Sequence, residues 1–389
     1  MKTILLVCMG NIIVLFDLTL FSIFYDKFLS FFPPQYVEKE RIIYYMFFLT
    51  CISRPIGGIF FGYISDFFGK EKSLILSIVA LSLSSSIIAI TPSYSHIGIL
   101  STIIVLLSRL IQGISMSGEE VVAAVFATKI KVTYKIPPVS FVMSTVFLGV
   151  LLSYFVALFI LNLNTTPWIW RSAFLIPLPI GICLAYLRYK EFFLLGPVLL
   201  IKEKYKINIK KSLNDILLGT MLIAPYAASI YFYIAYLPHH LSGKFFYGIP
   251  WTIVTVFFLL CSFFCCLLSG MLLNIYKARM VYAFSCICLF IAFCFFSKDG
   301  FFLYLFLSIS TGLMAGSIMP ILFSLFPKNI ITTASSLSFN ISMLLFGSTI
   351  PLLFSFYPNI SKYIMMLIFS SYIIYIYTNG GVFCKKKSI

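Results

Sequence analysis

Four polar side chains follow one another along the apolar segment 97–127. Arg109, Gln112 and Glu120 share one narrow face of a helix, since successive residues lie about 100° apart, and Glu119 lies at the margin of that face. An ionised side chain near the centre of a bilayer costs about 3 kcal/mol or more, and it is kept where it faces a partner or a water-filled cavity. This polar face therefore predicts the lining of a solute path. The alternative is a buried ion pair that fixes helix packing.

Two more charges lie near the middle of apolar segments, Asp17 in 4–25 and Arg54 in 42–64. One interpretation is that they pair with each other across helices, and the other is that each faces a watery path. A buried carboxylate can take up and release a proton when its neighbouring cation moves. Asp17 and Glu119 are accordingly the predicted proton sites, and Arg54 joins the predicted substrate site.

Tyrosines recur in the segment 214–236, at Tyr226, Tyr231, Tyr233 and Tyr236. Aromatic faces attract desolvated cations and quaternary ammonium groups, whereas a guanidinium binds a carboxylate. Rings opposite the arginine of the polar face would suit a zwitterion such as proline or a betaine, and Tyr231 is included in the predicted substrate site. The alternative is that these rings reflect the general aromatic content of a chain with 24 tyrosines and 43 phenylalanines.

A glycine-flanked turn after the second apolar segment carries Gly62, Asp66, Gly69 and Lys70, within the sequence GYISDFFGKEK. Glycines let two helices approach closely, and a carboxylate here can cap a helix or hold a cation that separates during a conformational change. The pattern predicts a conformational latch. The alternative is an ordinary tight turn beside cytoplasmic cations.

A diverged copy of this turn, GMLLNIYKAR, follows the eighth apolar segment. Gly270 matches the first glycine, and Asn274 stands at the position of the aspartate. Internal repetition is typical of transporters built from two similar halves. Gly270 and Asn274 are therefore the predicted residues of a second latch.

Apolar segments of transmembrane length make up most of the chain. Of its 389 residues 61% are hydrophobic and 10% are charged, which is more apolar surface than one water-soluble core can hide. A helical crossing needs about 20 apolar residues, so we expect an all-α membrane protein with twelve transmembrane helices in two six-helix bundles. The predicted spans are 4–25, 42–64, 73–91, 97–127, 138–162, 168–188, 214–236, 249–274, 280–297, 301–326, 335–356 and 361–379.

A polar stretch at 189–213 divides these spans six and six. The predicted units are an N-terminal bundle at 1–188, a cytoplasmic linker at 189–213 and a C-terminal bundle at 214–389. With both termini cytoplasmic, most lysines and arginines fall on the cytoplasmic side, as the positive-inside rule requires. The net charge of +16 therefore indicates orientation in a membrane rather than a nucleic-acid partner.

No sequence pattern indicates a metal, a cofactor or an enzyme. The ten cysteines lack the spacing of a zinc site and are interpreted as small buried residues, while His239 and His240 are interpreted as solvated loop residues. The sequence has no phosphate-binding loop and no nucleophile elbow. We expect a monomer in a lipid bilayer, whose first span is retained rather than cleaved as a signal peptide.

Several motifs, in order along the chain, resemble those of one transporter family. They are GNIIVLFD at Gly10–Asp17, SRPIGGIFFGYISDFFGKEK at Ser53–Lys72, SRLIQGISMSGEE at Ser108–Glu120, WIWRSAF at Trp168–Phe174 and FNISMLLFGSTIP at Phe339–Pro351. With them the chain resembles the major facilitator superfamily, in its metabolite:proton symporter branch. The resemblance implies alternating access across a bacterial inner membrane. It also implies import of a small organic solute by proton symport, either a zwitterion of the proline or betaine type or an organic acid.

The chain departs from the pattern of that family at two positions. Val14 stands where the family has an acidic residue, and Phe67 stands where the family usually has an arginine in its first latch. An uncoupled facilitator or exchanger of the same fold is therefore one alternative. A non-transporting, degenerate member of the family is another.

Overall fold

The computed structural model describes residues 2–33, 39–130, 136–162, 168–194, 212–232, 234, 245–246, 249–272, 275–294 and 301–349. Every predicted span except 361–379 overlaps a described helix, and that last span lies outside the described residues. Nine of the described helices are long and apolar enough to cross a membrane. The prediction of a helical protein with many membrane spans is confirmed.

The N-terminal helices come from the part of the chain before the predicted linker. The long ones are α1 (Lys2–Ile23), α3 (Lys39–Phe68), α4 (Lys70–Ile90), α6 (Ile99–Ala127), α7 (Pro138–Asn162) and α9 (Pro177–Leu194). The short ones are α2 (Tyr25–Phe28), η1 (Leu29–Phe31), α5 (Tyr94–Ile97), η2 (Ile169–Arg171) and α8 (Ser172–Leu175). A helix satisfies all backbone hydrogen bonds within itself, and for this reason continuous apolar sequence becomes helical in lipid.

The C-terminal helices follow the predicted linker, which lies mostly outside the described residues. They are α10 (Leu213–Tyr231), α12 (Trp251–Met271), α13 (Ile275–Cys294), α14 (Phe301–Phe323), α15 (Ile331–Ser342) and the π-helical η6 (Met343–Ser348). The described strands form one antiparallel hairpin of β1 (Phe245–Phe246) and β2 (Ile249–Pro250), in register Phe245 to Pro250 and Phe246 to Ile249.

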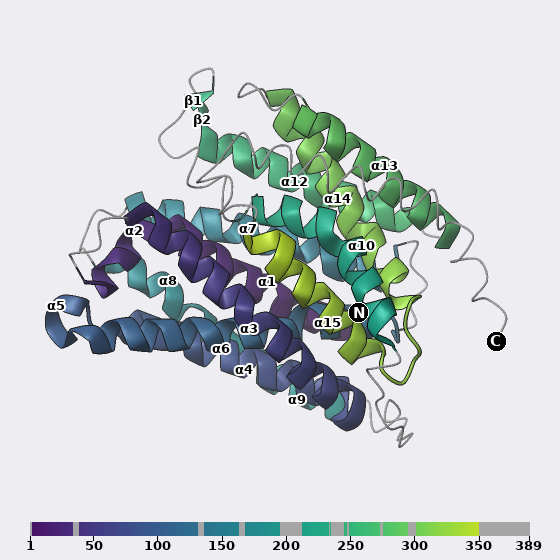
Figure 1. The fold of residues 1–389 in the computed structure, drawn as a ribbon. Coiled ribbons are helices and arrows are strands. Elements are labelled where there is room, and N and C mark those ends of the chain that lie inside the picture. Colours follow the sequence, from purple (N-terminus) through teal and green to yellow (C-terminus); the bar gives the residue numbers. More distant parts are fainter. Residues whose placement is uncertain are drawn as a thin grey trace.

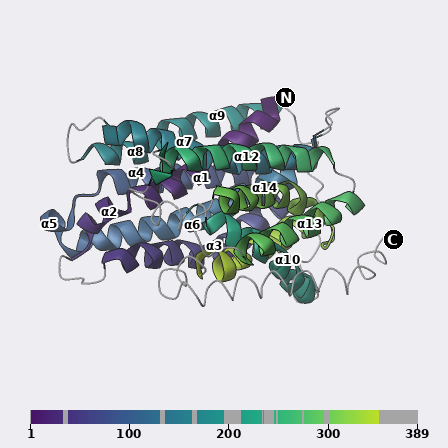
Figure 2. The same cartoon turned by 90° about the horizontal axis from the view of Figure 1, so that it is seen from above.

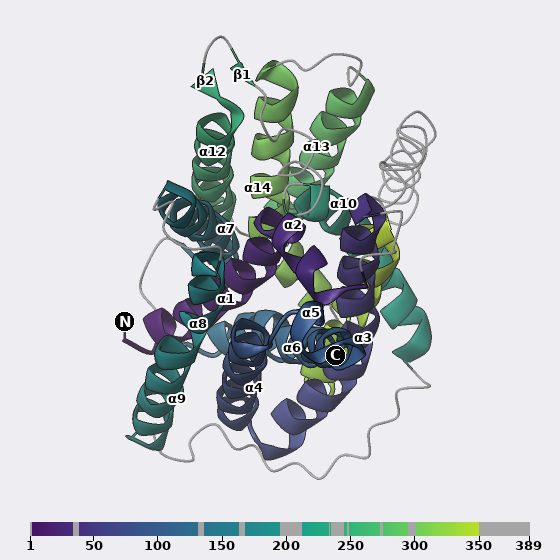
Figure 3. The same ribbon diagram turned by 90° about the vertical axis from the view of Figure 1, so that its left-hand side faces the viewer.

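The long helices run side by side in broadly the same direction (Figures 1 and 2). In Figure 3, α3, α4, α6 and α9 lie on one side of the molecule and the green helices α12, α13 and α14 lie on the other. The two sets meet along two seams, where α3 packs on α15 and α7 packs on α12. Large apolar side chains such as Ile56, Phe60 and Tyr186 remain more than a third exposed on the outside, as contact with lipid requires.

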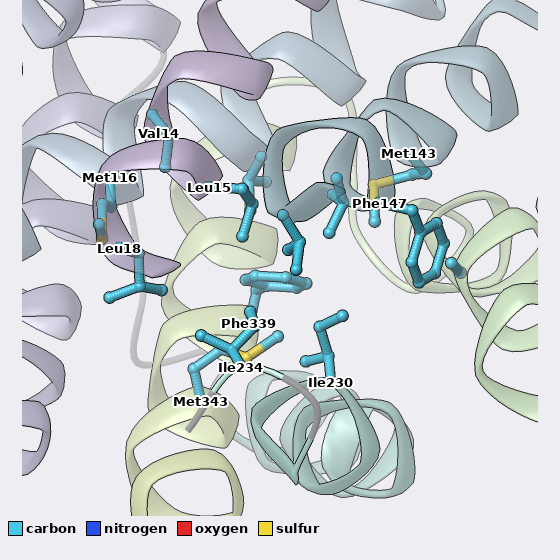
Figure 4. Packing of buried hydrophobic residues seen from close by; sticks show 14 of the residues in the cluster. Val14, Leu15, Leu18, Met116, Met143, Phe147, Ile230, Ile234, Phe339 and Met343 are labelled. Carbon is cyan, nitrogen blue, oxygen red and sulfur yellow. The ribbon is translucent and has the colours of Figure 1, made fainter. Parts of the chain in front are cut away.

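An apolar layer occupies the centre, between the N-terminal and the C-terminal helices. Figure 4 shows the side chains that meet there, all of them buried. They are Val14, Leu15 and Leu18 of α1, Met116 of α6, Met143 and Phe147 of α7, Ile230 and Ile234 in and after α10, and Phe339 and Met343 of α15 and η6. The two sets of helices therefore meet at the centre through apolar side chains.

Candidate functional site

Arg109 on α6 is fully buried against aromatic rings. Its guanidinium carbon lies 3.8 Å from the centre of the Phe21 ring and 5.1 Å from the centre of the Phe28 ring. Among the described residues, none of its three guanidinium nitrogens has a hydrogen-bond partner. Buried polar groups are nearly always hydrogen-bonded, so the N–H groups of Arg109 require a partner that the surrounding side chains do not supply.

Asp17 and Gln112 carry further unpartnered polar atoms in the same region. One carboxylate oxygen of Asp17 accepts a hydrogen bond from Ser85 Oγ, while Oδ2 has no partner in the described part of the chain. Gln112 lies one turn of α6 from Arg109, and neither atom of its amide is paired with a described residue. Asp17 lies near enough to Arg109 for their charges to interact. We call Asp17, Arg109 and Gln112 the Arg109 cluster.

A second set of polar residues surrounds Arg54 on α3. The guanidinium forms an ion pair with Glu120 of α6 through Nη2. It also donates from Nη1 to the hydroxyl of Tyr231 at 3.0 Å and from Nε to Oδ1 of Asn340 at 3.0 Å. We call these four residues the Arg54 cluster. Arg54, Glu120 and Tyr231 are among the residues predicted to line the solute path or the substrate site, whereas Asn340 is not.

Two predicted juxtapositions are wrong. Arg54 does not pair with Asp17, because Arg54 pairs with Glu120, whereas Asp17 accepts a hydrogen bond from Ser85. Tyr231 lies against Arg54 rather than opposite the Arg109 guanidinium. The sequence gives the position of a residue along a helix, but which neighbour it touches depends on how each helix is rotated about its axis.

Glu119 and Arg188 form a fully buried ion pair. Oε2 of Glu119 also accepts hydrogen bonds from Ser77 Oγ and Arg188 Nη1, both at 3.0 Å. Arg188 donates further to the carbonyl of Leu74 at 2.7 Å. Glu119, a predicted proton site, is thus engaged at both oxygens. The sequence analysis missed Arg188 because an arginine at the end of an apolar segment resembles an ordinary flanking cation.

Gly10 on α1 makes room for this pair. A Cβ atom added at Gly10 would lie 1.8 Å from Oε1 of Glu119 and 2.1 Å from Nη2 of Arg188. A side chain at this position would have to displace the Glu119 and Arg188 side-chain ends, so the glycine of GNIIVLFD leaves the space that the ion pair occupies. The ion pair of Glu119 with Arg188 therefore joins α1, α6 and α9 at one point.

Met116 separates the Arg109 cluster from the Arg54 cluster along α6. It is fully buried and lies one turn from Gln112 and one turn from Glu120, so the two polar clusters stand about 12 Å apart along the helix. Figure 4 shows Met116 beside Val14 and Leu18 of α1. The predicted polar face is thus interrupted at its centre by the apolar layer.

Asp66 joins the end of α3 to the start of α15. Its Oδ2 accepts hydrogen bonds from the backbone N–H of Thr333 at 2.9 Å and from the Thr333 hydroxyl at 2.7 Å. The N-cap residue of α15 is Ile330, whose side chain cannot accept a hydrogen bond. Asp66 therefore caps a helix of the other set, and its negative charge lies at the positive end of the helix dipole. Lys70 Nζ lies 4.0 Å from the same carboxylate.

Steric constraints explain why glycine occupies both positions 62 and 69 of the first predicted latch. A Cβ at Gly62 would lie 2.6 Å from the Cα of Thr333, so α3 and α15 touch backbone to backbone. Gly69, between α3 and α4, has φ 102°, which is strained for any residue with a side chain. Gly62, Asp66, Gly69 and Lys70 thus form one structural unit at this seam.

The second predicted latch is described only in part. A Cβ at Gly270 would lie 2.6 Å from the Cβ of Ser140, so Gly270 marks a close contact of α12 with α7. Ser140 Oγ donates to the carbonyl of Gly316 on α14 at 2.9 Å. Asn274 lies outside the described residues.

Comparison with known proteins identifies the family of the chain. Residues 7–351 match the model of the Major Facilitator Superfamily. The chain belongs to the Major Facilitator Superfamily. Members of this superfamily are secondary transporters and not enzymes, so the chain is a multi-pass membrane transporter by family.

Curated relatives match part of the chain. A proline/betaine transporter of Salmonella typhimurium is 35% identical over 144 residues, which are 35% of this chain and 28% of that protein. An alpha-ketoglutarate permease of Escherichia coli is 33% identical over 125 residues, 32% of this chain and 29% of that protein. The similarity to these relatives thus spans less than a third of their length, within the metabolite:proton symporter branch.

Solved structures share the fold along nearly the whole chain. The proton:xylose symporter XylE bound to 6-bromo-6-deoxy-D-glucose has a TM-score of 0.75 and 16% sequence identity, over 97% of this chain and 94% of that chain. The inward-open xylose transporter XylE from E. coli has a TM-score of 0.70 and 17% identity, over 97% and 95%. This similarity is one of fold alone.

Metal-binding side chains do not gather in the described part of the chain. No three histidine, cysteine, aspartate or glutamate side chains there come together as a metal site. His239 and His240 lie outside the described residues.

Proposed function

We propose that this superfamily member imports a small organic solute with one carboxylate, of the proline or betaine type, by proton symport with alternating access. The Arg109 cluster is the observation that supports the proposal. Asp17, Arg109 and Gln112 together have six buried polar atoms without a partner among the described residues. A solute carboxylate accepts hydrogen bonds from a guanidinium and an amide at once, so it would satisfy several of these atoms.

Charge pairing favours a solute with one carboxylate over a dicarboxylate. Arg54 and Arg188 are each neutralised by a buried glutamate, and of these three arginines only Arg109 has every guanidinium nitrogen unpartnered within the described residues. A second carboxylate would have to break one of the two glutamate pairs, at a large desolvation cost. The rings of Phe21 and Phe28 suit the apolar body of a small zwitterion.

Asp17 is the proposed proton carrier. In the absence of solute its charge interacts with that of Arg109. A bound solute carboxylate takes over the guanidinium, and Asp17 then becomes neutral by taking up a proton. Release of the solute leaves the charges of Asp17 and Arg109 to interact again, so solute and proton travel together.

The contact of Asp66 with Thr333 supports a state in which the path is closed at this end of the seam. In the proposed orientation, with both termini cytoplasmic, this is the cytoplasmic end. Alternating access would then separate Asp66 from Thr333 and open the path to the cytoplasm in a bacterial inner membrane. A single chain contains both sets of helices, and we propose that the monomer is the transporting unit.

Uncoupled exchange is the second candidate function, and the position of Val14 favours it. Val14 stands where the family has an acid, and its side chain lies in the apolar layer. Glu119 is held by Arg188 and Ser77, which leaves Asp17 as the carboxylate with an unpartnered oxygen near Arg109. Proton coupling thus depends on Asp17.

Uptake into proteoliposomes tests the proposal. The purified chain is reconstituted and offered radiolabelled proline, glycine betaine and α-ketoglutarate, with and without an imposed pH gradient. We expect accumulation of a monocarboxylate zwitterion only with the gradient, and much less transport of the dicarboxylate. Accumulation without any gradient would refute symport, and failure of the folded protein to move any solute of a wider panel would refute transport.

A matched pair of variants locates the proton site. Asp17→Asn should abolish gradient-driven accumulation but retain counterflow, because an amide cannot exchange a proton and yet occupies the same space. Asp26→Asn, at an exposed position on α2, removes the same charge away from the cluster and should leave both activities unchanged. Equal coupling in the Asp17→Asn variant would exclude Asp17 as the carrier.

A further inference from the structure

One face of α3 presents four residues to α15 at intervals of four. They are Arg54, Gly58, Gly62 and Asp66. A Cβ at Gly58 would lie 3.1 Å from Nδ2 of Asn340 and 3.2 Å from the carbonyl of Ser336, and the Gly62 contact with Thr333 is closer still. The seam is therefore a stretch of backbone contact with a polar side chain at each end, about 18 Å apart along α3.

The Asp66 end of this seam has an obvious partner, the start of α15. The Arg54 end consists of hydrogen bonds within the apolar interior, since Arg54 is 1% exposed. Glu120 belongs to the N-terminal helices, as Arg54 does, and it would move together with Arg54. Tyr231 and Asn340 belong to the C-terminal helices. Separation of the two sets must therefore break the bonds of Arg54 to Tyr231 and Asn340 and preserve the ion pair.

We propose that Tyr231 and Asn340 are positioning residues that hold Arg54 across the seam and so keep the path closed within the membrane, as a lock separate from Asp66. The inference rests on the proposed alternating access. Arg54 thereby acts on the movement of the two sets and not on the solute. Its N–H groups are already bonded in the closed state, unlike those of Arg109.

The geometry gives Asn340 a particular part in this lock. Its Oδ1 accepts from Nε of Arg54, while its Nδ2 donates to the carbonyl of Ser336 at 2.7 Å on its own helix. The amide is thus oriented by α15 and offers its oxygen to α3. A methyl group at this position would make neither bond, and a carboxylate would place an oxygen against the Ser336 carbonyl and add a second buried negative charge beside Glu120. Both substitutions should therefore weaken the lock.

Hydrogen–deuterium exchange of the full chain in lipid nanodiscs, read by mass spectrometry, tests the lock without needing a solute. Asn340→Ala and Tyr231→Phe should each raise exchange in peptides from α3 and α15 by about tenfold, the shift expected from losing one hydrogen bond to a charged group. Asn340→Asp should also raise exchange there, because it loses the bond to the Ser336 carbonyl. Peptides from α7 and α12 serve as the internal reference.

Ser140→Ala is the matched control, since it removes a buried hydroxyl bond at the other seam. It should leave exchange in α3 and α15 unchanged. The lock is refuted if Asn340→Ala and Tyr231→Phe, both folded, exchange as the wild type does. These results are independent of transport, so a chain that carries no tested solute would contradict the proposed function and leave the lock open to the same test.

Discussion

The seam of α3 with α15 and the seam of α7 with α12 join the same two sets of helices with different chemistry. The first has the charged residues Asp66 and Arg54, each hydrogen-bonded to the opposite set. In its described part the second has small and uncharged contacts, such as Ser140 beside Gly270, and Cys266 Sγ at 3.5 Å from the carbonyl of Ser140. Charged bonds depend strongly on direction and distance, whereas small apolar contacts tolerate sliding. On the proposed alternating access, we expect opening to be controlled at the first seam, with the second seam as the pivot.

The largest effect is expected from Arg54→Ala. Removal of the guanidinium leaves Glu120 buried without its counter-charge, which should lower the free energy of unfolding by about 3–5 kcal/mol. Denaturant titration in detergent micelles measures this change. The double variant Arg54→Ala with Glu120→Gln should recover part of the loss, because the buried charge is then absent. A loss of the same size in Ser140→Ala would remove the contrast between the seams.

Substitution of a glycine by alanine should have different consequences at the two seams, because one glycine contacts backbone and the other contacts a side chain. Gly62→Ala places a methyl group against the backbone of α15, and Gly270→Ala places one against the Ser140 side chain, each at 2.6 Å. Overpacking of this kind costs about 1–3 kcal/mol. Thermal unfolding should show that Ser140→Gly rescues Gly270→Ala, whereas Thr333→Gly does not rescue Gly62→Ala, because the Cα of residue 333 remains. Rescue at both sites would show that the first seam is as adaptable as the second.

Asp66→Ala should cost about 1–2 kcal/mol of stability, the usual value of a helix cap. Its larger consequence is expected in transport, because the closed state loses a contact that the open state never makes. The variant should show faster counterflow or a leak, measured in proteoliposomes. Asp66→Asn is the conservative control, since an amide oxygen still accepts a hydrogen bond from the N–H of Thr333. Identical behaviour of the two variants would argue against a capping role.

The smallest effect on transport is expected from Ser140→Ala. The free energy of unfolding should fall by about 1–2 kcal/mol, because the Gly316 carbonyl loses the Ser140 hydroxyl and Pro320, four residues on, has no N–H to replace it. Counterflow should stay near the wild-type value. A strong loss of transport in the folded variant would indicate that the pivot seam also controls opening.

The sequence predicted the helices and their order, because long apolar segments have a single solution in lipid. It also singled out Arg109 and Gln112, whose polar atoms the structure buries without a partner among the described residues, since charge at the middle of a span is costly and rare. The sequence could not show which residues the polar side chains contact. Arg188 looked like a flanking cation, and Asn340 is a neutral amide without a distinctive cost. Tyr231 was placed opposite the wrong arginine because depth and rotation of α10 relative to α6 are properties of the packed structure.

The two parts of the predicted polar face on α6 also differ in a way that sequence does not show. Glu120 and Glu119 find cations on α3 and α9, whereas Arg109 and Gln112 have no hydrogen-bond partner within the described residues. Met116 separates the two parts. The same helical face thus contributes to the proposed solute site at one end and to inter-helix bonds at the other.

The central claim is tested most directly by equilibrium binding of a radiolabelled solute, which the uptake panel first identifies. Binding to the purified wild-type chain is compared with binding to the Arg109→Ala variant. Arg109 and Gln112 are proposed to bind the solute carboxylate, so Arg109→Ala should weaken binding by at least about tenfold, the loss expected for a charge-assisted contact. Arg171→Ala, at an arginine stacked 4.2 Å from the Trp168 ring outside the cluster, should bind as the wild type does. Unchanged affinity in a folded Arg109→Ala variant would contradict the account.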